Sequence, residues 1–92
     1  MENIMESFLN YLSVGRRLSP NTIAAYRNDL SQFVAFVTKQ GGKDLTLDRG
    51  LILSYISAIK EREYAPSTVA RKVAVIKSFS DFLVNRGILA QD

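Results

Sequence analysis

The sequence predicts an all-α protein that folds as one compact bundle of four helices. Apolar residues recur at the three- and four-residue spacing of amphipathic helices in four separate stretches, and glycine or proline marks the ends of these stretches. A chain of 92 residues with 47% hydrophobic content also suits a single domain with one core, which we place at residues 1–92.

The first predicted helix covers residues 2–14, and Gly15 ends it. The apolar residues that recur at helical spacing in this stretch are Ile4, Phe8, Tyr11 and Leu12. We expect this side of the helix to face the core.

The second predicted helix covers residues 20–40. Ser19 can cap it by accepting a hydrogen bond from a free backbone N–H, and Pro20 suits the first helical position, where its missing N–H costs nothing. Gly41 and Gly42 supply the stop. Its predicted core stripe comprises Ile23, Tyr26, Leu30, Phe33, Val34 and Val37.

The third predicted helix covers residues 48–62, with either Thr46 or Asp48 as its cap. Its apolar residues are Leu51, Ile52, Tyr55, Ile56 and Ile59.

The fourth predicted helix covers residues 66–86 and ends before Gly87. Val75 and Phe82 lie on a flank of its apolar stripe, so we expect this helix to be buried more broadly than the second. The stripe itself comprises Val69, Val73, Ile76, Phe79 and Leu83.

Residues 65–87 repeat much of the pattern of residues 19–41 without a gap. The identical pairs are Pro20 with Pro66, Thr22 with Thr68, Ala24 with Ala70, Phe33 with Phe79, Phe36 with Phe82, and Gly41 with Gly87. Two interpretations stay open: any two amphipathic helices share such features, or two helix pairs repeat and place these helices equivalently. Two units are too few for a solenoid, so a compact bundle is expected either way.

The composition excludes most catalytic and metal chemistry. The chain holds no cysteine and no histidine, which removes disulfides, thiolate nucleophiles, the usual general base and the commonest metal ligand. Because no tight acidic cluster is present either, we expect no catalytic residues, no metal site and no cofactor. No apolar run approaches the roughly 20 residues of a membrane span, so a cytoplasmic protein without membrane contact is expected.

Two helix faces remain outside the predicted core, and both are small and polar. A solvated helix face usually carries many long Glu and Lys side chains, whereas small residues let a backbone approach a phosphate-lined groove. The face on the second helix comprises Asn21, Ala24, Ala25, Asn28, Ser31 and Gln32, with Arg27 at its margin. The face on the fourth helix comprises Ser67, Ala70, Arg71, Ala74, Lys77 and Ser78, with Lys72 near its opposite margin.

These faces predict contacts with nucleic acid. Arg and Lys neutralise phosphates, Asn suits adenine, Arg suits guanine, and hydroxyls near a helix start lie close to a natural phosphate site. For Thr22 and Thr68, a local bond to the helix cap is an equal alternative. The predicted DNA-binding residues are Asn21, Thr22, Arg27, Asn28, Ser67, Thr68, Arg71, Lys72 and Lys77.

Two sequence runs resemble the N-terminal core-binding domain of tyrosine recombinases, the phage-integrase and Xer-type enzymes. The first run is S-x-x-T-x-x-x-Y-x-x-D-L-x-x-F at Ser19, Thr22, Tyr26, Asp29, Leu30 and Phe33. The second is T-x-x-R-x-x-x-x-I-K-x-F-x-x-F-L at Thr68, Arg71, Ile76, Lys77, Phe79, Phe82 and Leu83. The resemblance covers nearly the whole chain and implies a SAM-like orthogonal bundle.

The resemblance also implies a function. The domain would form one jaw of a clamp around double-stranded DNA at a recombination site, with the second and fourth helices against the major groove. The catalytic residues would belong to a separate C-terminal domain, so this chain is expected to be a DNA-binding fragment without enzymatic activity. Neighbouring recombinase protomers would be its other partners.

An alternative function is a helical protein-interaction module. In that case exposed flanks at Phe36, Val75 and Phe82, together with the first helix, would dock another protein or another protomer.

Overall fold

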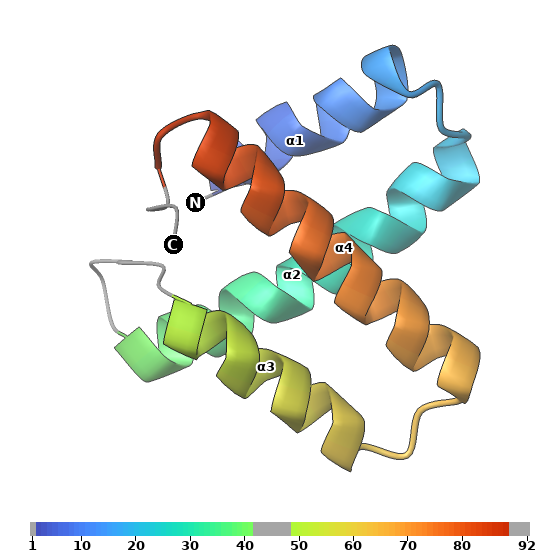
Figure 1. Ribbon diagram of the computed structural model, residues 1–92. Helices are drawn as coiled ribbons and strands as arrows, with labels where there is room; N and C mark the ends of the chain where they lie inside the picture. The colour runs from blue at the N-terminus through green and yellow to red at the C-terminus, as the bar shows by residue number, and fades with distance from the viewer. Residues whose placement is uncertain (1, 42–48, 89–92) are drawn as a thin grey trace.

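The computed structural model describes residues 2–41 and 49–88, which form four α-helices (Figure 1). Helix α1 covers Glu2–Gly15, α2 covers Pro20–Gly41, α3 covers Arg49–Glu61 and α4 covers Pro66–Asn85. The predicted all-α bundle is therefore confirmed, with helix limits within one residue of those expected. The predicted caps Thr46 and Asp48, and the predicted stop Gly42, lie outside the described residues.

The helices are arranged around the crossing of α2 and α4. In Figure 1, α4 passes in front of α2 near the middle of both helices, while α1 and α3 lie on opposite sides of that crossing. Helix α2 packs against each of the other three helices. The two helices that carry the predicted DNA-binding faces thus form the centre of the bundle.

Phenylalanine rings hold α4 in this position. Phe79 of α4 lies 5.2 Å from Phe8 of α1 and 6.3 Å from Phe33 of α2, measured between ring centroids. All three side chains are about 1% exposed, and such pairs add about 0.5–1.5 kcal/mol each beyond the burial of their area. The remaining core residues are Met5, Leu9, Leu12, Leu30, Val37, Ile52, Tyr55, Ile59, Val75, Ile76, Phe82 and Leu83.

The expected apolar flank of α4 is not exposed. Val75 is 1% exposed and Phe82 is 7% exposed, so the prediction that they form a docking surface is wrong. Phe82 packs against Phe8 and Tyr11 of α1, and Phe36 is half-buried beside Tyr55 of α3. Broad burial of α4 was expected, and it arises because neighbours cover this helix on more than one side.

The ends of α2 and α4 show which local signals were correct. The Ser19 hydroxyl accepts a hydrogen bond from the backbone N–H of Thr22 at 3.2 Å, which confirms the predicted cap of α2. Helix α4 starts at Pro66 but has no side-chain cap, because Ala65 stands where α2 has a serine.

Gly87 closes α4 as predicted. It has a φ of +73°, its N–H bonds the carbonyl of Val84, and the N–H of Ile88 bonds the carbonyl of Leu83. This pair of bonds is a Schellman motif, which needs a residue in the left-handed region.

Candidate nucleic-acid interface

The structure leaves most of the two predicted faces at the surface. We call these surfaces the α2 face and the α4 face. Their exposed residues are Asn21, Ala24, Asn28, Ser31 and Gln32 on α2, and Ser67, Ala70, Ala74 and Lys77 on α4. Their half-buried residues are Ala25 on α2, and Arg71 and Ser78 on α4. An exposed surface of small and polar residues therefore borders the central helix crossing on both helices.

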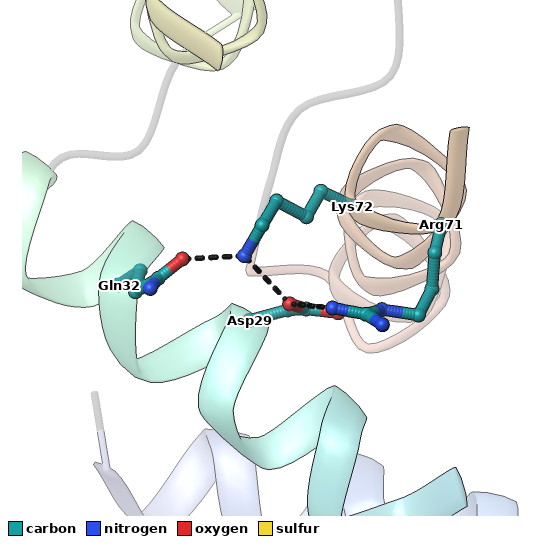
Figure 2. Close-up of polar contacts among 4 residues, drawn as sticks. All are labelled: Asp29, Gln32, Arg71 and Lys72. Carbon is teal, nitrogen blue, oxygen red and sulfur yellow. Dashed lines mark hydrogen bonds and ion pairs between the residues drawn. The ribbon is translucent and has the colours of Figure 1, made fainter. Parts of the chain in front are cut away.

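A buried carboxylate joins the two faces. Asp29 of α2 is 1% exposed and accepts a bidentate pair of bonds from Arg71 of α4 (Figure 2). Arg71 Nε lies 2.9 Å from Asp29 Oδ2, and Arg71 Nη2 lies 3.0 Å from Asp29 Oδ1. Paired bonds of this kind fix the guanidinium plane as well as stabilising the charge. These bonds also raise the pKa of Arg71 above its usual value, so this residue is charged at physiological pH.

Lys72 approaches the same carboxylate from the inside of the bundle. Its Nζ lies 2.8 Å from Asp29 Oδ1 and 2.6 Å from Gln32 Oε1, and Figure 2 shows it between these two residues. The ammonium also lies 5.1 Å from the centroid of the Tyr64 ring, in the connection between α3 and α4. At 3% exposed, Lys72 is a core residue, which differs from its predicted place at the margin of the α4 face.

The buried polar atoms of the resulting charge cluster all have hydrogen-bond partners. Among the described residues, no buried side-chain nitrogen or oxygen lacks a hydrogen-bond partner. Two cations share one carboxylate, so the cluster of Asp29, Arg71 and Lys72 carries one net positive charge. Buried ion pairs lower stability sharply when only one partner is removed, because the other charge is left without compensation.

The other predicted contacts fall into two groups. Arg27 forms an ion pair with Glu6 of α1, and the hydroxyl of Thr22 accepts a hydrogen bond from the hydroxyl of Ser19. Both side chains therefore have partners within the bundle. Asn21, Asn28, Ser67 and Lys77 are exposed, while Thr68 is half-buried.

Neither a membrane-spanning helix nor a cluster of metal-ligating side chains is present among the described residues. Across residues 2–41 and 49–88, no helix combines the length and apolar character that a membrane crossing requires. The same residues contain no group of three or more acidic, histidine or cysteine side chains that could hold a metal ion.

Comparison with known proteins identifies the family. The family described as "Phage integrase, N-terminal SAM-like domain" matches residues 5–87. The chain belongs to this family. The SAM-like fold and the resemblance given by the two sequence runs are thereby confirmed.

Relatives of this SAM-like domain are similar over most or all of its length. It is 46% identical to Tyrosine recombinase XerC of Roseiflexus castenholzii over the whole chain, and 46% identical to Tyrosine recombinase XerC of Herpetosiphon aurantiacus over 90% of the chain. Tyrosine recombinase XerD of Listeria monocytogenes is 37% identical over the whole chain. The SAM-like domain spans only 28–32% of the length of these relatives. No solved structure matches it.

Asp29 is the residue of this site to which we assigned no role from the sequence. It stands in the first family-like run, three residues after Tyr26 and four before Phe33. This spacing places it beside the core stripe of α2, where an acidic residue requires a buried partner. The sequence therefore indicated that Asp29 needs a buried partner, but which residues fill that role depends on how α4 packs against α2.

Proposed function

We propose that this chain binds duplex DNA as the clamp domain of a tyrosine recombinase. The observation that carries the proposal is the meeting of the α2 face and the α4 face at the Asp29–Arg71 contact, which combines two exposed, small-residue surfaces with a net positive charge. Membership of a family whose relatives are named tyrosine recombinases supports the same function. Recombination itself, and contacts with neighbouring protomers, are part of the proposal for the whole protein.

In this proposal the major groove receives the α2–α4 crossing. The groove is about 12 Å wide and admits a helix. Ala24, Ala70 and Ala74 are small, so they let the helix backbone approach the groove closely. Asn21 and Asn28 supply amide groups for base edges or phosphates, and Lys77 supplies a mobile charge for the backbone.

The structure refines the roles that we propose for the predicted contacts. Arg71, Lys77, Asn21, Asn28 and Ser67 are proposed as direct contacts because their side chains are at least partly exposed. The N–H groups at the start of α4 have no side-chain cap, which suits a phosphate near Ser67 and Thr68.

The bonding of Lys72, Arg27 and Thr22 favours supporting roles. Lys72 neutralises Asp29, Arg27 links α2 to α1, and Thr22 completes the cap of α2. Contact of these three residues with DNA remains a prediction.

Salt-dependent binding tests the proposal. A labelled duplex is titrated with the protein at several salt concentrations, and log affinity is plotted against log salt. We expect a straight line of negative slope, and Lys77→Ala should flatten it by about one unit because one phosphate contact is lost. Lys39→Ala is the matched control, since it removes an exposed lysine from the last turn of α2, outside both faces. Absent or salt-independent binding at low ionic strength would contradict the proposal.

A second candidate function is protein interaction through α1. Tyr11 is 44% exposed and Val14 is 70% exposed, and their three-residue spacing places them on one side of that helix. Sedimentation at increasing protein concentration tests this candidate: self-association that Val14→Ser abolishes would support it. If the protein stays monomeric at every concentration, self-association through α1 is excluded.

A further inference from the structure

The bidentate contact with Asp29 occupies only part of the Arg71 guanidinium. An arginine offers five N–H donors in a rigid plane: one on Nε and two on each Nη. Asp29 takes the Nε donor and one Nη2 donor. The donors on Nη1 and the second donor on Nη2 form the outer edge of the plane, and they make no hydrogen bond within the described residues. Because the Arg71 side chain is 39% exposed, this outer edge is accessible.

Lys72 changes what Arg71 can do electrostatically. A carboxylate paired with arginine alone would form a neutral unit with little attraction for an anionic partner. Here the Lys72 side chain, 4% exposed, supplies a second positive charge to Asp29 from inside the bundle. The cluster therefore keeps one positive charge, and Arg71 is its exposed member.

We infer that Asp29 is a positioning residue that holds Arg71 so that its outer edge recognises a guanine in the major groove. This inference rests on the proposed function, and it specifies which base the Arg71 part of the α4 face recognises. Guanine presents O6 and N7 as two adjacent acceptors in one plane, and this pair matches two donors of a guanidinium edge.

Three observations favour a base over a phosphate at this position. A phosphate can be bound by a mobile cation such as Lys77, whereas base recognition needs a fixed plane, which Asp29 provides. Lys72 already compensates the buried carboxylate, so Arg71 is not required there for neutralisation alone. Ala70 and Ala74, beside and one turn from Arg71, are exposed and leave room for base edges.

The test selects sequences from a library of short duplexes with a randomised central segment, using the 92-residue protein. We expect the wild type to enrich guanine at one position. Replacing that guanine with 7-deazaguanine, which lacks the N7 acceptor, should weaken binding roughly ten-fold. Lys77→Ala should weaken binding to all sequences about equally and leave the guanine preference intact, because it removes only a phosphate contact.

Two variants separate positioning from a merely structural role. Asp29→Asn removes the carboxylate charge at nearly constant shape, so the guanine preference should be lost while affinity for random duplexes does not fall. Arg71→Lys keeps the charge but loses the planar edge, so the salt slope should be unchanged and the guanine preference should disappear. Neither variant should respond to 7-deazaguanine.

Thermal melts followed by circular dichroism show whether each variant is folded. If Asp29→Asn does not fold, Arg71→Lys carries the test, because its lysine can still pair with Asp29. A wild type that binds duplexes with no guanine preference, or an Arg71→Lys variant that keeps the preference, would overturn this inference alone. A wild type that binds no duplex at low ionic strength would overturn the proposed function as well.

Discussion

Replacing Asp29 with alanine should destabilise the bundle more than any other single change in the charge cluster. The substitution leaves the Lys72 ammonium inside the protein with Gln32 and Tyr64 as its remaining partners. Removing one member of a buried ion pair costs about 3–5 kcal/mol. A domain of this size has a total stability of about 5–14 kcal/mol, so the loss is a large share of it.

Comparison with two further variants isolates the cause. Arg71→Ala should cost about 1–2 kcal/mol, because Arg71 is partly exposed and Asp29 keeps its bond to Lys72. The double variant Asp29→Leu with Lys72→Met should recover most of the stability that Asp29→Ala loses, since apolar residues of similar volume replace both buried charges. Arg71 can turn toward solvent in that variant.

Urea unfolding and thermal melts, both followed by circular dichroism, measure the free energy of unfolding and the melting temperature of all three variants. The expected loss for Asp29→Ala corresponds to a lower melting temperature by at least about 12 °C, using about 4–8 °C per kcal/mol for a chain of this length. A loss below about 1 kcal/mol, or a loss smaller than that of Arg71→Ala, would refute the assignment of a buried, stabilising carboxylate.

Two other predictions concern parts of the fold outside the cluster. Burial and the nearby Tyr64 raise the pKa of Tyr55 to about 12. In the unfolded chain the phenol ionises near its ordinary pKa of about 10, whereas in the folded protein it stays neutral up to about pH 12. The free energy of unfolding that this difference contributes is therefore fully present below about pH 10 and is lost as the pH rises toward about 12. Tyr55→Phe should lose less stability over that interval, as urea unfolding at about pH 9 and about pH 11 would show; an identical loss would contradict the shift. Gly87→Ala should cost about 1–2 kcal/mol, because Gly87 has a φ of +73° while the space for a Cβ is open. A melting temperature equal to the wild type would contradict the left-handed turn.

The helices could be predicted because their signals are local. A repeat of three and four residues, a serine before Pro20 and a glycine after α4 each act within a few residues of the chain. Val75 and Phe82 show the limit of such signals. They lie beside the main stripe of α4, and their burial depends on how the other helices pack, as the contact of Phe82 with Phe8 of α1 shows.

The candidate site was only partly predictable for a similar reason. The exposure of Asn28, Ala74 and Lys77 follows from the angular spacing of each helix taken alone. The contacts of Asp29 with Arg71 and Lys72 join residues 42 and 43 positions apart, so they depend on how α4 crosses α2. Lys72 lies one position from the half-buried Arg71, yet the crossing of α4 over α2 places Lys72 in the core.

The shared carboxylate has a consequence for attempts to retarget this domain. In a surface that reads bases through independent side chains, one contact can be exchanged without regard to the rest. Here Arg71 and Asp29 form one unit across two helices. A new residue at position 71 would therefore leave Asp29 without the two hydrogen bonds that Arg71 donates to it. Libraries designed to alter the proposed sequence preference should therefore vary positions 29 and 71 together, and should also vary position 72 wherever position 29 loses its charge.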